Sequence, residues 1–281
     1  MTAEISEEKL KDLENKAREI RKLIIRMLAE AGSGHTAGPL GMADIFTAMY
    51  FYVLNHDPKN PNWENRDRLI LSNGHICPVQ YAAMALAGYF PTDELMTLRK
   101  IGSRLQGHPH RKDLPGLETT SGPLGEGLSQ AIGQAIAAKM DGKKHQIYCL
   151  TSDGEHQEGN TWEAAMFTGA NRLSNITQII DRNNIQITNF TEEVMPIEPL
   201  KEKYEAFNWD VLEIDGNNIK AFVDAVDIAK KNKEKPTVII AHTIPGFGVS
   251  FFENDYHWHG KAPSKDEAER ALKELDLEAS I

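Results

Sequence analysis

The fold of this chain is decided by two stretches, His145-Gln-Ile-Tyr-Cys-Leu-Thr-Ser-Asp-Gly154 and Asn175-Ile-Thr-Gln-Ile-Ile-Asp-Arg-Asn-Asn-Ile185. Each begins with an apolar run of strand length, and the segment between them has a helical pattern. Together they predict a strand, a crossover helix and a second, parallel strand. Asp153 and Asn183 follow the two strands, thirty residues apart. Because open α/β sheets bind ligands at the carboxyl ends of their parallel strands, these side chains predict a binding site there.

The residue types at this edge indicate a divalent cation. Mg²⁺ or Ca²⁺ prefers hard oxygen ligands, and Mg²⁺ usually combines one or two protein ligands with phosphate oxygens. Gly154 has no side chain, so a diphosphate could come close to the backbone there. An isolated Asp-Gly after a strand is more often an ordinary turn. The partner at Asn183 makes a binding site the better interpretation.

Strand and helix patterns alternate along most of the sequence. Strands are predicted at residues 68–71, 145–151, 175–180, 210–214 and 237–242. Helices are predicted in the first thirty residues, at 45–54, 125–140, 158–171, 199–207 and 219–231, and in a tail after Pro263. Such alternation is typical of an α/β fold, a mainly parallel sheet with helices on both faces. We expect one domain over residues 1–281.

Composition is that of an ordinary globular enzyme domain. Of the 281 residues, 41% are hydrophobic, which is enough for a sizeable core. The formal net charge of −10 disfavours nucleic acid and anionic membrane as partners. Only Cys77 and Cys149 occur, no apolar run is long enough to span a bilayer, and the charged first ten residues do not form a signal peptide. We therefore expect a reducing cytoplasm.

Six motifs stand in order along the chain. They are Ser33-Gly-His35, Leu71-Ser-Asn-Gly-His75, Leu105-Gln-Gly-His-Pro109, Thr119-Thr-Ser-Gly-Pro-Leu-Gly-Glu-Gly127, the Asp153/Asn183 pair and Trp258-His-Gly-Lys261. The Asp/Asn pair resembles the thiamine-diphosphate motif, in which GDG is followed about thirty residues later by N. The whole set resembles the transketolase family. Two departures are Ser152, in place of the first glycine of GDG, and Thr36, where a proline commonly follows the histidine.

The resemblance implies the thiamine-diphosphate-binding fold, called the PP domain, with thiamine diphosphate and Mg²⁺ or Ca²⁺ as cofactors. Full-length transketolases also carry a pyrimidine-binding domain and a C-terminal domain, which this chain lacks. The resemblance therefore implies the N-terminal subunit of a split transketolase, which transfers a two-carbon ketol unit from a ketose phosphate to an aldose phosphate. A separate C-terminal subunit would supply the glutamate that activates the aminopyrimidine, in an α2β2 assembly.

The resemblance also assigns roles to residues that hold the cofactor. The metal ligands would be Asp153, the Asn183 side chain and the Ile185 carbonyl. The diphosphate would be held by His75, Gly154 and the Glu155 backbone N–H. Gly122 and Leu124 would approach the ring system through backbone atoms, and Ile187 would pack on the thiazolium.

Catalytic and interface residues follow from the same resemblance. His35, His108 and His259 would line the channel and exchange protons with sugar hydroxyls. His257 and His110 lie two residues from His259 and His108, so either could be the working imidazole, although the matched positions are preferred. Glu158 and Glu163 match glutamates that reach the subunit interface in the family. A first-turn helix carboxylate is the structural alternative for Glu158.

The sequence is also compatible with two other functions. One is a related thiamine enzyme subunit, similar to deoxyxylulose-phosphate synthase or dihydroxyacetone synthase. The other is a non-catalytic scaffold that binds the cofactor. The motifs at residues 105–109 and 258–261 favour transketolase over the first alternative, and the intact metal and histidine positions disfavour the second.

Overall fold

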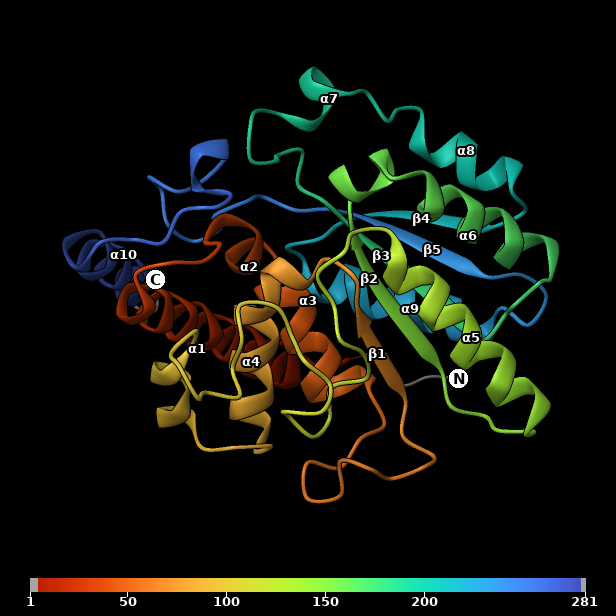
Figure 1. Cartoon of the computed structure of the whole chain (residues 1–281), viewed down its shortest axis with the longest axis horizontal. Helices are drawn as coiled ribbons and strands as arrows, with labels where there is room; N and C mark the ends of the chain where they lie inside the picture. Colours follow the sequence, from red (N-terminus) through yellow and green to blue (C-terminus); the bar gives the residue numbers. More distant parts are fainter. Residues whose placement is uncertain (1–4, 279–281) are drawn as a thin grey trace.

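A five-stranded sheet organises the part of the chain that the computed structural model describes, residues 5–278 (Figure 1). Its strands are β1 (Arg68–Leu71), β2 (Ile147–Ser152), β3 (Ile176–Arg182), β4 (Asp210–Asp215) and β5 (Thr237–His242). The order across the sheet is β1-β2-β3-β5-β4, and every adjacent pair is parallel. The predicted α/β fold with a mainly parallel sheet is confirmed.

Ten α-helices accompany the strands in the described residues. They are α1 (Glu7–Ala31), α2 (Ala37–Gly41), α3 (Ala43–Ala48), α4 (Cys77–Ala87), α5 (Glu126–Met140), α6 (Gly159–Ala170), α7 (Thr191–Val194), α8 (Leu200–Ala206), α9 (Ile219–Lys231) and α10 (Lys265–Glu278). None of these helices is long and apolar enough to cross a membrane.

Helices cover both faces of the sheet, as the sequence predicted. Tyr148 and Leu150 of β2 belong to a buried cluster that includes side chains of α1, α3, α4 and α9. Ile147 and Cys149, the alternate residues of the same strand, belong to a second cluster with α5, α6 and α8. Successive side chains of a strand point to opposite faces, so a strand covered on both sides is buried at every position and mostly apolar. All six residues of β2 are buried.

The N-terminal and C-terminal helices pack against each other at one side of the molecule (Figure 1). Helix α1 begins after Ser6, whose hydroxyl accepts the Lys9 backbone N–H, and ends at Gly32 in the left-handed conformation. Its apolar stripe is fully buried at Leu13 and Ile20, in agreement with the predicted amphipathic helix. The predicted helical tail is α10, which is tied to α1 by an ion pair of 2.7 Å between Lys22 and Asp276.

Helix α4 was not predicted from the sequence. Every residue from Cys77 to Ala85 is buried, so the helix has no polar face to reveal a period of 3.6 residues. Pro78 stands in its first turn, where a missing N–H has no cost. The five-residue α2 was also missed, because its glycines and proline are typical of a loop.

Candidate active site

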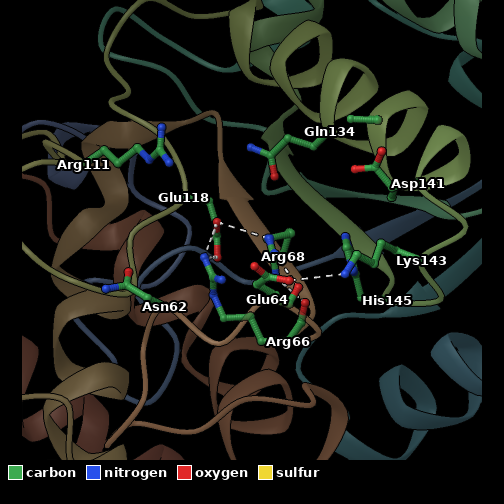
Figure 2. A pocket seen from close by; sticks show the side chains of 12 residues that line it. Asn62, Glu64, Arg66, Arg68, Arg111, Glu118, Gln134, Asp141, Lys143 and His145 are labelled. Atoms are coloured by element: carbon green, nitrogen blue, oxygen red, sulfur yellow. Dashed lines mark hydrogen bonds and ion pairs between the residues drawn. The ribbon is translucent and has the colours of Figure 1, made fainter.

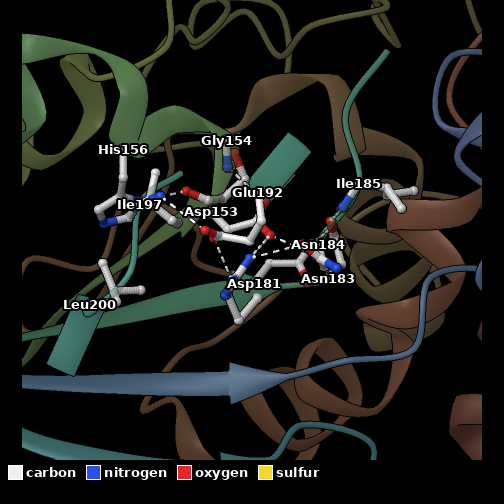
Figure 3. A network of polar contacts seen from close by, with 12 residues as sticks. Asp153, Gly154, His156, Asp181, Asn183, Asn184, Ile185, Glu192, Ile197 and Leu200 are labelled. Atoms are coloured by element: carbon white, nitrogen blue, oxygen red, sulfur yellow. Dashed lines mark hydrogen bonds and ion pairs between the residues drawn. The ribbon is translucent and has the colours of Figure 1, made fainter. Parts of the chain in front are cut away.

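The carboxyl ends of β2 and β3 place the predicted metal ligands side by side (Figure 3). Asp153 follows β2 and is fully buried. Its Oδ1 accepts the Gly154 N–H at 2.6 Å, and its Oδ2 accepts the Asn184 N–H at 2.6 Å from the turn after β3. Ser152, the last residue of β2, has an extended conformation, so serine fits where the family pattern has glycine.

The side chain of Asn183 is oriented by Asp181, a residue to which no motif in the sequence gave a role. Asn183 Nδ2 donates to Asp181 Oδ2 at 2.8 Å, and its Oδ1 accepts the Ile185 N–H at 3.0 Å. The other carboxylate oxygen of Asp181 accepts a hydrogen bond from Thr243. Burial raises the pKa of Asp181 to about 7, with a further upward contribution from the negative charge of Asp153.

Arg182 supplies a positive charge directly beside Asp153. Its Nη1 lies 3.0 Å from Asp153 Oδ2, and its Nη2 lies 2.7 Å from Glu192 and 3.0 Å from Glu198. Burial raises the pKa of Asp153, and the guanidinium opposes that shift. Arg182 thus ties the end of β2 to the segment that carries α7, a link that no motif in the sequence indicated.

Glu155 has a role through its side chain as well as its backbone. The carboxylate is fully buried and accepts hydrogen bonds from the Ser72 hydroxyl, from Gly125 N–H at 2.6 Å and from Ser152 N–H at 3.1 Å. Burial raises its pKa, which these three donors oppose. The side chain therefore holds the loop before α5 against the ends of β1 and β2. Only a use for the backbone N–H was predicted from the sequence.

Three histidines from separate loops form one cluster. The ring centroids of His35 and His75 are 4.9 Å apart, those of His75 and His259 are 5.3 Å apart, and those of His35 and His259 are 5.5 Å apart. Thr36 joins two of the loops, because its buried hydroxyl donates to the Lys261 carbonyl at 2.5 Å. The threonine that departs from the family pattern therefore anchors the loop of His35.

Burial keeps this cluster neutral near pH 7. It lowers the pKa of His35 and of His259 to about 4 and lowers that of His75 well below its usual range. A hydrogen bond with the Ile185 backbone opposes part of the shift at His259. Nδ1 of His35 and Nδ1 of His259 are buried and have no hydrogen-bond partner in the described structure. Neutral imidazoles of this kind can accept a proton from a bound hydroxyl group.

The depressed pKa of His35 predicts a pH dependence of stability. Between pH 6.5 and about 4 the unfolded chain binds a proton at this residue that the folded chain does not. The free energy of unfolding should therefore fall as the pH falls through this window, by about 1.4 kcal/mol per pH unit for one histidine, and should be unaffected above it. Urea unfolding of His35→Asn at pH 7, 5.5 and 4.5 should give a shallower slope than wild type. His257→Asn, with 69% of the side chain exposed in the native protein, is the control. Equal slopes for wild type and His35→Asn would contradict the assignment.

The remaining predicted residues lie around the cluster. Gly122 has φ +154°, and a Cβ added there would lie 3.8 Å from the His108 ring, so its loop contacts His108. A Cβ at Gly260 would lie 3.9 Å from His35 Nε2 and 4.0 Å from Ile187. The Ile187 side chain is 70% exposed. Gly122 therefore adjoins His108, and Gly260 adjoins both His35 and Ile187; Leu124, in the Gly122 loop, is half-buried.

The alternative histidines are engaged elsewhere. His257 Nδ1 lies 2.6 Å from the Asp255 carboxylate, and His110 Nδ1 lies 3.1 Å from the Asp113 carboxylate. Neither ring makes an aromatic contact with the cluster within the described residues. The structure therefore groups His259, and not His257, with His35 and His75.

Glu158 and Glu163 are both exposed on α6. Glu158 is the N-cap residue of the helix, although its side chain makes no capping hydrogen bond. Met166 and Phe167, on the same exposed side of the helix as Glu163, are 55% and 46% exposed. The role of the two glutamates at an interface stays a prediction.

A cavity of about 550 Å³ lies at the opposite edge of the sheet (Figure 2). It is lined by residues at the amino ends of β1 and β2, among them Arg66, Arg68 and Lys143. Glu118 lies 2.8 Å from Arg66 and 3.6 Å from Arg68, and Lys143 pairs with Glu64. Most of its charges are therefore paired within the protein, and none of the clustered histidines His35, His75 and His259 lines it.

The sequence model of the transketolase thiamine diphosphate binding domain matches residues 13–280. The chain belongs to this transketolase family. It is 42% identical over 269 residues to the 6-deoxy-6-sulfo-D-fructose transketolase subunit of Clostridium sp. strain MSTE9, covering 96% of this chain and 98% of that protein. It is 44% identical over 265 residues to an apulose-4-phosphate transketolase subunit of Actinobacillus succinogenes, covering 94% of this chain and 96% of that protein.

Solved transketolase structures have the same fold. The structure from Campylobacter jejuni superposes with a TM-score of 0.89 at 35% sequence identity. The match covers 95% of this chain and 43% of that one. The comparisons support a transketolase subunit that binds thiamine diphosphate, and they do not favour the other thiamine enzymes or the scaffold.

Proposed function

We propose that this chain is the N-terminal subunit of a split transketolase, transferring a two-carbon ketol unit between sugars together with a separate C-terminal subunit. The observation that carries the proposal is the position of Ile185. Its backbone N–H donates to Asn183 Oδ1 at 3.0 Å, and its backbone lies close enough to the His259 ring to offset part of the lowering of that ring's pKa. An edge of hard oxygens therefore adjoins a cluster of imidazoles suited to proton transfer.

The residues at this edge fit a divalent ion with a diphosphate. A carboxylate offers about four lone-pair positions, and Asp153 uses three of them for Gly154, Asn184 and Arg182. One position remains for an ion, which Asn183 Oδ1 and the Ile185 carbonyl would complete as Mg²⁺ or Ca²⁺ ligands. Gln186 Oε1, which is buried and unpartnered, lies beside Gly154.

The other cofactor contacts are assigned from the resemblance to the transketolase family. His75, Gly154 and the Glu155 N–H would hold the diphosphate of thiamine diphosphate. Gly122, Leu124 and the exposed Ile187 would contact its rings. Bound thiamine diphosphate supplies the electron sink for breaking a carbon–carbon bond next to a carbonyl group.

The histidines of the chain would move the protons. His35 and His259, both neutral at pH 7, would accept a proton from a sugar hydroxyl and later return it. Burial of these rings excludes water from the side of the site that they form. His108, which contacts the Gly122 loop, would orient the sugar at the open side.

The partner would cover the exposed side of this site. Glu163, Met166 and Phe167 present a mixed carboxylate and apolar surface of α6, which suits a subunit interface. Glu158 would reach the same interface, and we propose an α2β2 assembly. The relatives named as subunits support a separately encoded partner. We also propose that the chain folds as one domain and that it acts in the cytoplasm.

The substrate class rests on the names of the relatives. One relative is named for 6-deoxy-6-sulfo-D-fructose and the other for apulose 4-phosphate. Both names describe a sugar with an anionic group at a distance from the reacting carbons. We propose ketoses and aldoses with such a terminal group, phosphate in the first instance, as substrates.

Reconstitution tests the proposed function. The purified chain alone should transfer no ketol unit from xylulose 5-phosphate to ribose 5-phosphate, because the activating glutamate belongs to the partner. Addition of the C-terminal subunit, with thiamine diphosphate and Mg²⁺, should produce turnover. Appreciable turnover by the rigorously purified chain would overturn the split site. Absence of ketol transfer from any phosphorylated, sulfonated or neutral ketose by the assembled pair would overturn the transketolase activity itself.

A further inference from the structure

Arg182, the last residue of β3, is the centre of a buried network of polar contacts. Its side chain is 8% exposed, and a guanidinium carries five N–H donors in a fixed fork. Nη1 donates to Asp153 at 3.0 Å and to Asn184 at 3.4 Å. Nη2 donates to Glu192 at 2.7 Å, and Nη2 and Nε donate to Glu198 at 3.0 Å and 3.2 Å. All five donors therefore have an acceptor within the chain.

The two glutamates use their other oxygens to hold the backbone of residues 191–200, called here the 191–200 segment (Figure 3). Glu192 Oε2 accepts the Ile197 N–H at 3.3 Å, and Glu198 Oε2 accepts the Leu200 N–H at 2.6 Å. Between α7 and α8 this segment forms neither helix nor strand. Side-chain contacts such as these therefore fix its path.

Asp153 connects the same guanidinium to the proposed metal site. Its Oδ2 accepts both Arg182 Nη1 at 3.0 Å and the Asn184 N–H at 2.6 Å. Asn184 has φ +60° and stands between Asn183 and Ile185, the two other proposed metal ligands. The position of the guanidinium therefore affects the direction of the Asp153 carboxylate and the turn that carries the other ligands.

The charges of this network require a cation at its centre. The guanidinium faces three carboxylates, those of Asp153, Glu192 and Glu198, which would repel one another without it. The two glutamates in turn offset its positive charge, so Arg182 is not a bare cation facing an ion bound at Asp153. Lysine could not make the same contacts, because its three donors lack the planar fork of a guanidinium.

We propose that Arg182 is a positioning residue that couples the 191–200 segment to cofactor binding by this subunit. The proposal rests on the proposed function, because Asp153 would bind the ion that holds the diphosphate. Arg182 is not itself a ligand: it fixes the Asp153 carboxylate on one side and the two glutamates on the other. Glu192 lies ten residues along the chain from Arg182 and hydrogen-bonds none of the proposed metal ligands. A change at Glu192 should nevertheless alter the affinity for the cofactor.

Calorimetric titration of the assembled two-subunit enzyme with thiamine diphosphate at fixed Mg²⁺ tests the coupling. Arg182→Gln should weaken binding roughly 10- to 100-fold, the usual effect of losing a residue that orients a metal ligand. Glu192→Gln should weaken binding roughly 2- to 30-fold, the range found for substitutions that act through a network. Glu193→Gln is the matched control and should bind as wild type, because Glu193 is adjacent and exposed but accepts a hydrogen bond from Asn189.

A double-mutant cycle separates this coupling from a general loss of stability. Affinity in the double variant Arg182→Gln/Glu192→Gln should lie within about twofold of that in Arg182→Gln alone, because Glu192 acts through the guanidinium. Hydrogen exchange of the 191–200 segment in the cofactor-free enzyme should accelerate in both single variants and not in Glu193→Gln.

Three results would overturn the coupling. One is wild-type affinity in Glu192→Gln. The second is additive losses in the double variant, which would show that the two residues act independently. The third is tighter binding in Arg182→Gln, which would show that its charge mainly repels the ion. Failure of the wild-type enzyme itself to bind thiamine diphosphate would overturn the proposed function, so the two failures are distinguishable.

Discussion

Asp153→Ala is expected to weaken thiamine diphosphate binding by the assembled enzyme by more than about 100-fold. The substitution removes the only charged group of the proposed ligand set, Asp153, Asn183 and Ile185. Loss of residues that merely support metal ligands typically costs 10- to 100-fold in affinity, so loss of a ligand should cost more. Calorimetric titration of thiamine diphosphate at fixed Mg²⁺ measures the effect, and metal binding in the presence of the cofactor gives a second readout.

Two further variants separate a lost ligand from a damaged fold. Arg182 retains Glu192 and Glu198 after the substitution, so the chain should still fold, as circular dichroism can check. Asp153→Asn keeps an oxygen without the charge and should bind with intermediate affinity. Asp215→Asn, at the exposed carboxyl end of the edge strand β4, is the matched control and should bind normally. Wild-type affinity in a folded Asp153→Ala enzyme would refute the metal site.

The strands and the oxygen-bearing edge could be predicted from sequence because both depend on local pattern. Strands buried on both faces are rich in apolar residues without a regular alternation, so β2 and β3 were evident from their Ile, Leu, Tyr and Cys runs. Once these strands are parallel neighbours, the residues that follow them must meet at one edge. Asp153 and Asn183 meet for this geometric reason.

The partners of these residues could not be predicted, because they depend on distant segments. The bond between Thr36 and Lys261 joins positions 225 residues apart, and that between Ser72 and Glu155 joins positions 83 apart. A threonine or a glutamate in a loop carries no local sign of such a contact. The Arg182 ion pair with Asp153 was equally hidden, since an arginine at the end of a strand is ordinarily a surface residue.

The site also explains why two separate subunits could share one reaction. This chain positions neutral imidazoles and hard oxygens through contacts within its own fold, such as those of Asp181 and Glu155. These groups need no partner to be held in place. A second subunit would then add the activating carboxylate to a half-site that is already organised, which reduces the ordering cost of assembly.

Glu155→Ala is expected to destabilise the chain by about 3 kcal/mol or more. The substitution leaves three donors, Ser72 Oγ, Gly125 N–H and Ser152 N–H, without their common acceptor in a buried place. Hydrogen bonds to charged groups contribute about 1.5 to 3 kcal/mol each, and burial of the carboxylate offsets part of that sum. Urea unfolding of the full chain at pH 7 measures the loss.

Glu155→Gln and Glu126→Ala complete the experiment. The glutamine oxygen can accept from Ser72 and Gly125, but its NH₂ group faces the Ser152 N–H, so an intermediate loss is expected. Glu126 lies in the first turn of α5, beside the same loop, and is exposed, so its loss should change stability by less than about 1 kcal/mol. Hydrogen exchange at residues 121–127 should accelerate in Glu155→Ala and not in Glu126→Ala, because of these two glutamates Glu155 is the one that accepts a hydrogen bond from that loop. Unaltered stability and exchange in Glu155→Ala would show that the loop before α5 is held by other contacts.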